Sequence, residues 1–520
     1  MSQRNRVLIA TILGSSIVFL DSTIVNVALE TIGRELPATF VGRLEGLTYV
    51  SSAYFAILSA LLILAGALND YYGRARMFRI GLIGFGAASV GCGLAPTLEL
   101  LILARIVQGA FGALLIPGSL SILTAAFEGE ERGRAIGLWT AGTSATLIAG
   151  PLIGGALVQM IDWRAAFLVN VPLVLLALWP AAAIEESRDE QASGRFDWLG
   201  AAVIAIGVGG LAFGATRGQQ KAWEDPIAWA ALIIGVVAMA AVPILMLKRP
   251  NPLIPPRLFA SRDFTVVNLA TLVIYGALYV SFAAEGIFFQ GTLGYSPVAA
   301  GAVGLPISLL LTFLSTPAGR LSSRLGPRPF MTAGPLLMAG GLIWLSFVPN
   351  DITSWDADPA DLASLIPPID AITGIVLPLT LFGIGISLVV APLTTALMGS
   401  VPVRNAGLAS AINNAISRVG QPLVWAVLFI AMTAAFYPTL AELVPGLDVN
   451  DPALRDAVQP LASVRGDVAE EVAAAAREAS IASFQLAMIV SAGLLVVGAA
   501  ISAVGLRPSA GKGREGSKTG

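Results

Sequence analysis

The sequence predicts an all-α integral membrane protein with fourteen membrane-spanning helices. Its 520 residues are 56% hydrophobic and only 12% charged, whereas soluble domains carry about 25% charged residues. Apolar stretches recur along the whole chain, and each is long enough to cross about 30 Å of hydrocarbon as a helix. The composition therefore excludes a soluble globular protein, and no soluble domain of ordinary size is left over.

The hydropathy pattern places the helices in order along the chain, with boundaries accurate to a few residues. The predicted spans are 7–28, 46–68, 77–95, 100–126, 135–159, 165–184, 198–216, 227–247, 264–289, 298–318, 329–348, 371–396, 404–436 and 481–505. The start of the chain lacks a small-residue cleavage site, so we expect the first span to be retained.

The distribution of positive charge predicts the orientation. Loops on the side of the two termini hold 21 Lys and Arg residues and the opposite loops hold 8, while Arg105 and Arg418 lie within spans. Because cytoplasmic loops carry the excess of Lys and Arg, both termini are expected in the cytoplasm, with the protein in the cell membrane. The outer loop 349–370 is predicted to be acidic and solvated, and loop 437–480 to form a small cap whose VAEEVAAAARE segment extends the last span as a helix.

A weak internal repeat indicates two related halves. GALNDYYGRAR follows the second span, and GRLSSRLGPRP follows the tenth, 253 residues later. Duplicated six-helix halves are a common plan of transporters, with the substrate site between them. We expect an N-terminal half (1–184), an inserted helix pair (185–263), a C-terminal half (264–505) and a cytoplasmic tail (506–520).

Three motifs occur in order within these spans. GALNDYYGR lies at residues 66–74, LARIVQGAFGA at 103–113 and GPLIGG at 150–155. They resemble, respectively, the first-loop signature, the fourth-helix motif and the antiporter motif of the major facilitator superfamily. With LDSTIVNVAL, DWRAAFLVNVP and FDWLG, the chain resembles the 14-span drug:proton antiporter family over essentially its whole length. Two departures are Tyr71, which replaces a basic residue of the loop signature, and Glu285, where the family more often has an uncharged residue.

The loop signature also has a physical interpretation. Gly66 and Gly73 allow a tight turn, and Asp70 can face a helix N-terminus or Arg74, both favourable for an anion. The alternative is an ordinary short turn with a cluster of positive charge. The resemblance implies that Asp70 and Arg74 govern the switch between inward-facing and outward-facing states.

The GPLIGG motif combines a helix kink with a strip for close packing. Pro151 removes a helix hydrogen bond, and Gly150 and Gly154 lie four residues apart, with Gly155 beside them. Ordinary small-residue packing is the alternative. The resemblance implies that this motif seals the two halves together at the outer end, which suits exchange rather than uniport.

Asp21 and Arg105 are predicted to form the proton-coupling site. Asp21 lies ~21 Å above the start of the first span and Arg105 ~8 Å below the outer end of the fourth, which is nearly the same depth. A charge in hydrocarbon costs at least about 2.5–3.5 kcal/mol, so two opposite charges at one level indicate a pair. The chain has no histidine, which leaves proton transfer to carboxylates. The alternative is that Asp21 belongs to a polar packing cluster with Ser22 and Asn26.

Other polar residues inside spans are candidates for lining a cavity. Glu285 is placed near the outer surface by its position in the ninth span, so an interfacial carboxylate is favoured over a cavity residue that could pair with Arg418. A structural role is slightly favoured over substrate contact for Arg418. The full set of cavity candidates is Asn26, Gln108, Asn170, Glu285, Asn413, Asn414 and Arg418.

These observations predict a monomeric, proton-driven exporter of lipophilic or amphipathic compounds, without cofactor, metal or nucleic-acid partner. The alternatives are a proton-linked exporter of a lipid or siderophore, a proton symporter importing a nutrient, and a scaffold or sensor. No phosphate-binding loop, nucleophile elbow or metal-binding motif indicates an enzyme. The substrate itself cannot be derived, because a promiscuous apolar cavity leaves no fixed motif.

Overall fold

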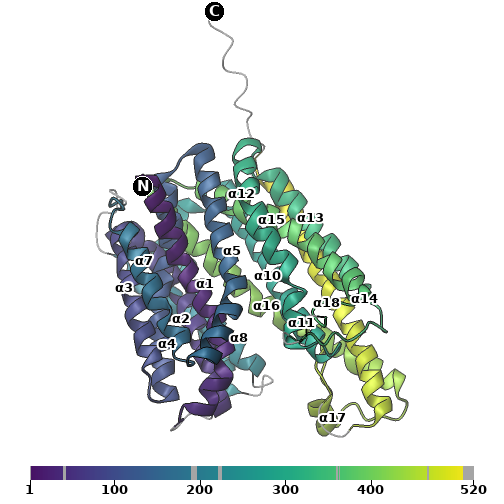
Figure 1. Cartoon of the computed structure of the whole chain (residues 1–520). Helices are drawn as coiled ribbons and strands as arrows, with labels where there is room; N and C mark the ends of the chain where they lie inside the picture. The colour runs from purple at the N-terminus through teal and green to yellow at the C-terminus, as the bar shows by residue number, and fades with distance from the viewer. Residues whose placement is uncertain are drawn as a thin grey trace, which may run out of the picture.

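The computed structural model describes residues 2–38, 43–188, 196–220, 225–358, 361, 363–464 and 468–507, and within these ranges it is helical, with no strand. Figure 1 shows long, roughly aligned helices in two groups. The expectation of an all-α membrane fold is confirmed. Each of the fourteen predicted spans coincides with a helix or with consecutive helices, and nine described segments are long and apolar enough to cross a membrane.

The first half contains the first six predicted spans, and the sixth is formed by two consecutive helices, α6 and α7. Its helices are α1 (Gln3–Glu35), α2 (Arg43–Tyr72), α3 (Arg74–Gly93), α4 (Leu98–Ala126), α5 (Gly129–Met160), α6 (Ala165–Leu168) and α7 (Asn170–Ala181). Ser2 and Thr97 cap α1 and α4 by accepting from free backbone N–H groups of the first turn. Gly73 separates α2 from α3 with a φ of +109°, a conformation that side chains rarely adopt.

The inserted pair consists of α8 (Trp198–Gln220) and α9 (Pro226–Lys248), followed by the short η1 (Pro256–Leu258). Buried Asp197 holds the base of the pair by accepting from the N–H groups of Gly200 and Leu253 and from the guanidinium of Arg249 at 2.8 Å. α8 packs on α2 and α16, whereas α9 is the most apolar segment and the least buried. An apolar helix that is exposed in this way is typical of a lipid-facing surface.

The second half repeats the arrangement. Its elements are α10 (Arg262–Gly291), α11 (Pro297–Ala302), α12 (Leu305–Leu325), α13 (Arg328–Leu345), α14 (Ile369–Ala371), η2 (Ile372–Val376), α15 (Leu377–Gly399), η3 (Val403–Asn405), α16 (Ala406–Leu443), α17 (Pro452–Ala457) and α18 (Glu470–Gly505). The predicted helical extension of the last span is confirmed, because α18 begins at Glu470. The predicted cap is a small apolar cluster in which α17 and the start of α18 pack on the end of α16.

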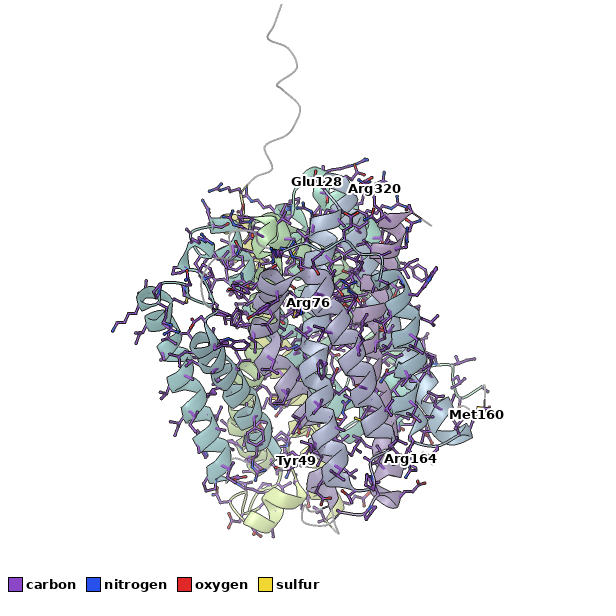
Figure 2. The ribbon with its side chains drawn as sticks, turned by 90° about the vertical axis from the view of Figure 1, so that its left-hand side faces the viewer. Tyr49, Arg76, Glu128, Met160, Arg164 and Arg320 are labelled. Atoms are coloured by element: carbon purple, nitrogen blue, oxygen red, sulfur yellow. The ribbon has the colours of Figure 1, made fainter. Side chains whose placement is uncertain are left out.

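The two ends of the bundle differ. We call the end that holds the start of α1 and the end of α18 the terminal end, and the opposite one the far end. The two groups of helices approach each other at the terminal end and spread apart toward the far end (Figure 1). Figure 2 places Glu128 and Arg320 at the terminal end and Tyr49, Met160 and Arg164 toward the far end.

Glycines at equivalent places of the repeat join the halves at the terminal end. Gly66 of α2 lies against the backbone of Gly407 in α16, and Gly319 of α12 lies against the backbone of Gly133 in α5. Gly66 and Gly319 are the first residues of the two copies of the internal repeat. The duplicated plan therefore has a physical basis in two matching helix contacts, and both close the terminal end.

Candidate functional site

The centre of the candidate site is the ion pair between Asp21 of α1 and Arg105 of α4. An Nη of Arg105 lies 2.6 Å from an Asp21 carboxylate oxygen. The side chain of Asp21 is 0% exposed and that of Arg105 is 1% exposed. The predicted pairing of these residues at matched depth is confirmed. With this little exposure, water does not screen the pair in this conformation, so its geometry must compensate for the lost hydration.

Further contacts fix the guanidinium of Arg105. Its Nε donates to the Val50 carbonyl at 3.0 Å, and its Nη1 also donates to the Gln108 amide oxygen at 2.6 Å. Its planar group lies 4.0 Å from the centre of the Tyr54 ring. Gly109 permits this arrangement, because a Cβ there would come within 2.7 Å of the Tyr54 carbonyl oxygen and push α2 away from α4.

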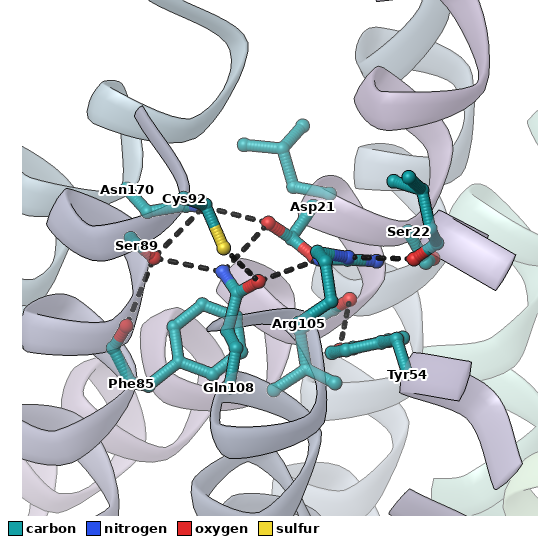
Figure 3. Close-up of polar contacts among 12 residues, drawn as sticks. Asp21, Ser22, Tyr54, Phe85, Ser89, Cys92, Arg105, Gln108 and Asn170 are labelled. Atoms are coloured by element: carbon teal, nitrogen blue, oxygen red, sulfur yellow. Dashed lines mark hydrogen bonds and ion pairs between the residues drawn. The ribbon is translucent and has the colours of Figure 1, made fainter. Parts of the chain in front are cut away.

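The carboxylate of Asp21 is held by two amides as well (Figure 3). One oxygen accepts from Gln108 at 2.9 Å and from Asn170 at 2.8 Å. Both amides also donate to the Ser89 hydroxyl, at 2.8 and 3.3 Å respectively. The site thus joins α1, α3, α4 and α7 through a continuous polar network inside an apolar bundle. Removing one member of such a buried pair destabilises by about 3–5 kcal/mol, because the other charge is left without a partner.

The network includes the predicted cavity residues Gln108 and Asn170 and adds members that the sequence did not indicate. Tyr54, Ser89 and the carbonyl of Val50 were missed because serine and tyrosine are common in membrane helices, and a backbone carbonyl has no sequence signal. Ser22 donates to the Phe19 carbonyl of its own helix at 2.6 Å, and the side chain of Asn26 lies outside the described residues. Asp21 is therefore the centre of an ion-pair network, which is more than the polar packing cluster considered as the alternative above.

Asp70 binds the N-terminus of α16 in the other half. Its two carboxylate oxygens accept from the N–H groups of Gly407 at 3.2 Å and Leu408 at 2.8 Å. Arg74 donates to the same carboxylate at 2.9 and 3.1 Å and also to the Val403 carbonyl. Both contacts expected for Asp70, with a helix N-terminus and with Arg74, are present together. They connect the halves at the terminal end.

Glu186 supports this loop and was not singled out in the sequence. Its carboxylate accepts from the N–H groups of Ala75 and Arg76, both at 3.0 Å, and so caps α3. A Cβ on Gly73 would come within 2.7 Å of this carboxylate. The two consecutive acids at 185 and 186, after the sixth span, were the available signal for this contact.

A second polar contact closes the terminal end between α5 and α12. Glu130 lies 2.6 Å from Arg320 and 2.8 Å from Arg324, all three on the surface. Hydrogen bonds from Arg324 and Arg320 lower the pKa of Glu130 from 4.5 to about 2. In the repeat, Ser323 occupies the place of Asp70, so the second half uses Glu130 of the opposing helix as its carboxylate.

The GPLIGG glycines pack within the first half. A Cβ on Gly150 would collide with the Thr23 side chain, and one on Gly154 would lie 3.1 Å from the Ile24 Cα, whereas Gly155 faces open space. Thr23 and Ile24 follow Asp21 on α1. Gly150 and Gly154 therefore face α1, as the packing alternative expects. The seal between the halves belongs to a state that is closed at the far end, and it stays a prediction. The side chain of Pro151 lies outside the described residues.

In the second half, Asn413 of α16 donates to Asn268 at 3.1 Å and to Thr271 at 2.8 Å, joining α16 to α10. Asn414 donates to the Ser410 carbonyl of its own helix. Arg418 of α16 is half-buried. Of the candidates on α16, Asn413 thus joins two helices of the second half, and Asn414 bonds within its own helix.

The structure corrects the position of Glu285. This side chain is only 5% exposed, and its Oε1 has no hydrogen-bond partner among the described residues. The favoured expectation of an interfacial carboxylate in water is therefore wrong. The rise per residue gave its depth but could not show that α10 continues to Gly291 and is covered there by α18. No ion pair between Glu285 and Arg418 is found within the described ranges.

Known proteins share this sequence pattern and fold. The sequence profile of the Major Facilitator Superfamily matches residues 11–425. Multidrug resistance protein Stp of Mycobacterium tuberculosis (strain CDC 1551 / Oshkosh) is 32% identical, covering 94% of this chain and 90% of its own. Puromycin resistance protein pur8 of Streptomyces alboniger is 32% identical over 84% and 83% of the two chains. The tetracenomycin C resistance and export protein of Streptomyces glaucescens is 29% identical over 95% and 90%.

Two solved structures share the fold at low sequence identity. The human organic anion transporter MFSD10 gives a TM-score of 0.60 at 14% identity, covering 96% of this chain and all of that one. The proton:xylose symporter XylE gives 0.57 at 15% identity, covering 96% and 95%. The profile, the relatives over nearly the full length and the duplicated helical halves agree: this chain belongs to the major facilitator superfamily.

Proposed function

We propose that this protein is a proton-coupled antiporter that exports lipophilic or amphipathic organic compounds across the cell membrane, with both termini in the cytoplasm. The observation that carries the proposal is the buried Asp21–Arg105 pair with its two amide ligands. A network of this kind costs stability in an apolar bundle, and intramembrane carboxylates mark proton and substrate pathways. The resistance and export named for the bacterial relatives support small organic compounds as cargo.

In the proposed cycle, Asp21 takes a proton from outside while the far end is open and the terminal end is closed. Protonation removes the negative charge that holds Arg105, so the ion pair is released. The Asp70 and Glu130 contacts then open, the halves rock, and Asp21 loses its proton to the cytoplasm. Substrate competes with this proton, and the proton gradient drives export in a monomer without a cofactor.

The test compares the wild-type protein with Asp21→Asn in an efflux-deficient host. Asparagine keeps the size of the side chain and one acceptor oxygen, but it cannot carry the proton or the charge, and its NH2 group cannot accept the hydrogen bond that Arg105 donates to the second carboxylate oxygen. We expect wild type to raise resistance to several lipophilic drugs and Asp21→Asn to lose all of this increase at equal membrane levels. Resistance that survives at the wild-type level in Asp21→Asn would contradict the mechanism.

The direction of transport is tested separately in proteoliposomes. With the lumen acidic, an antiporter oriented with its far end toward the lumen accumulates a lipophilic dye inside as protons leave. A symporter importing a nutrient would instead move its substrate in the same direction as the protons. Dye movement with the protons would therefore favour the symporter.

A further inference from the structure

We propose that a cavity at the terminal end, between the halves, binds a phosphate-bearing anion that holds this end closed. The cavity has a volume of about 340 Å³, within the range of about 300–1,000 Å³ that small-molecule sites occupy. Its walls come from the terminal ends of α5, α10, α12, α13, α15 and α18. The residues that matter here are Gly129, Arg132, Asp263, Ser322, Pro327 and Arg507.

Two arginines supply the positive charge. The Nε of Arg132 donates to the Phe127 carbonyl at 2.9 Å. The Nη groups of Arg132 and the guanidinium of Arg507 have no hydrogen-bond partner among the described residues. Two neighbouring arginines are already engaged: Arg262 and Arg328 donate to the last carbonyls of α18, at 2.7–2.8 Å. The negative end of α18 is thereby satisfied, which leaves Arg132 and Arg507 for a ligand. Guanidinium donors suit phosphate oxygens in charge and geometry.

Two helices direct uncapped N-termini at the same cavity. α5 begins at Gly129 and α13 follows Pro327, and neither helix has a side chain capping its first turn. Free N–H groups at a helix N-terminus carry partial positive charge and bind anions. Asp263 is the one acidic side chain of the lining, and it accepts from the backbone N–H of Arg507 at 3.3 Å. The cavity therefore carries net positive charge.

Ser322 provides an independent observation. This side chain is only 2% exposed, lines the cavity, and its Oγ has no hydrogen-bond partner among the described residues. A buried hydroxyl without a partner is unfavourable, and its presence requires an explanation. A phosphate oxygen in the cavity would accept from this hydroxyl and satisfy it.

The placement of the cavity links binding to conformation. Gly129 and Arg132 belong to the first half, and the remaining lining residues belong to the second. Separation of the halves at the terminal end would split the site, so an anion bound across it favours the closed state. This effect regulates the conformational equilibrium and does not depend on the transported compound or on Asp21.

The experiment measures thermal unfolding of the purified full chain by its tryptophan fluorescence. Sodium phosphate and dioctanoyl phosphatidylglycerol are added separately, against sodium chloride at matched ionic strength. We expect at least one phosphate probe to raise the Tm in a saturable manner. Arg132→Gln and Arg507→Gln should each weaken the apparent affinity at least tenfold. Arg134→Gln is the matched control, because Arg134 is exposed on the same helix, outside the cavity lining, and carries the same charge.

Ser322→Ala separates binding from folding. Removing an unpartnered buried hydroxyl should leave the Tm without phosphate unchanged or raised, yet reduce the shift that phosphate produces. Stabilisation by the lipid probe alone identifies a headgroup as the source, and stabilisation by inorganic phosphate alone identifies a soluble phosphate. No shift beyond chloride for either probe, or equal loss in Arg134→Gln, would overturn the proposal.

Discussion

At the scale of the residue, the identity of Arg105 matters as much as its charge. Its Nε and Nη1 bind Val50, Asp21 and Gln108 in different directions while the plane stacks on Tyr54. A lysine keeps the charge but lacks the planar fork, so it cannot make these contacts together.

We therefore expect Arg105→Lys to lower proton-driven transport by about 10- to 100-fold, since one charge-assisted hydrogen bond contributes about 1.5–3 kcal/mol. Dye efflux from vesicles measures this loss at equal protein levels. Arg164→Lys is the control, because Arg164 is 39% exposed and its ion pair with Asp162 is on the surface. Equal activity of Arg105→Lys and wild type would show that charge alone is sufficient.

Glu285 leads to a second prediction at this scale. Burying an unpaired carboxylate is unfavourable, and glutamine has the same shape without an ionisable group. We expect Glu285→Gln to leave the unfolding temperature unchanged or to raise it, as measured by thermal unfolding in detergent. A fall of several degrees would reveal that the carboxylate makes a stabilising contact, although its Oε1 has no hydrogen-bond partner among the described residues.

The sequence predicted the Asp21–Arg105 pair because depth in a membrane can be counted along a helix. The direction in which a side chain faces around the helix axis cannot be derived from the sequence with comparable accuracy. For this reason Tyr54 and Ser89, which face the pair from α2 and α3, were not predicted, and Glu285 was placed in water when it is buried.

At the scale of the element, the contact of α5 with α1 controls where Asp21 lies. A Cβ on Gly150 would collide with Thr23, two residues after Asp21, whereas Gly155 faces open space on the same helix. Both changes to alanine improve helix propensity similarly, so they differ chiefly in packing.

We expect Gly150→Ala to destabilise the protein by about 1–3 kcal/mol, the usual range for overpacking, and to reduce transport because α1 is displaced. Gly155→Ala should be neutral or slightly stabilising. Thermal unfolding and dye efflux on the two variants provide the comparison. A neutral Gly150→Ala would show that α1 has room to move without disturbing the site.

The elements themselves were largely predictable. Apolar runs indicated every span, and the alanine- and glutamate-rich segment indicated the extension of α18 to Glu470. What the motifs could not show is which neighbour a small-residue strip meets. The spacing of GPLIGG defines a strip of small residues, but it does not identify α1 as the helix that Gly150 and Gly154 meet.

At the scale of the whole molecule, closure of the terminal end depends on Asp70 and on Glu130. The pKa of Glu130 is lowered to about 2, so its contacts with Arg320 and Arg324 are present above its ordinary pKa and are lost as the pH falls toward 2. Between pH 5 and 8 this contact does not change. Any pH dependence of transport in that range must therefore come from another group.

We expect Glu130→Gln to shift the population toward an open terminal end. Cys92 is the single cysteine and is buried, so spin labels can be placed on new cysteines at the terminal end. One label is placed at an exposed position near the start of α5, and the other near the end of α12. Their distance distribution should broaden toward longer values in Glu130→Gln than in the wild-type protein at the same pH. An unchanged distribution would mean that the Asp70 contact is sufficient for closure.

The most direct test of the central account records proton and substrate movement together. Wild-type and Asp21→Asn proteoliposomes contain a pH indicator, and a fluorescent lipophilic dye is added without an imposed gradient. We predict that dye movement through the wild-type protein drives protons in the opposite direction, and that Asp21→Asn moves no protons. Opposed proton movement at the wild-type rate in Asp21→Asn would contradict the role of the Asp21–Arg105 pair as the proton-coupling site.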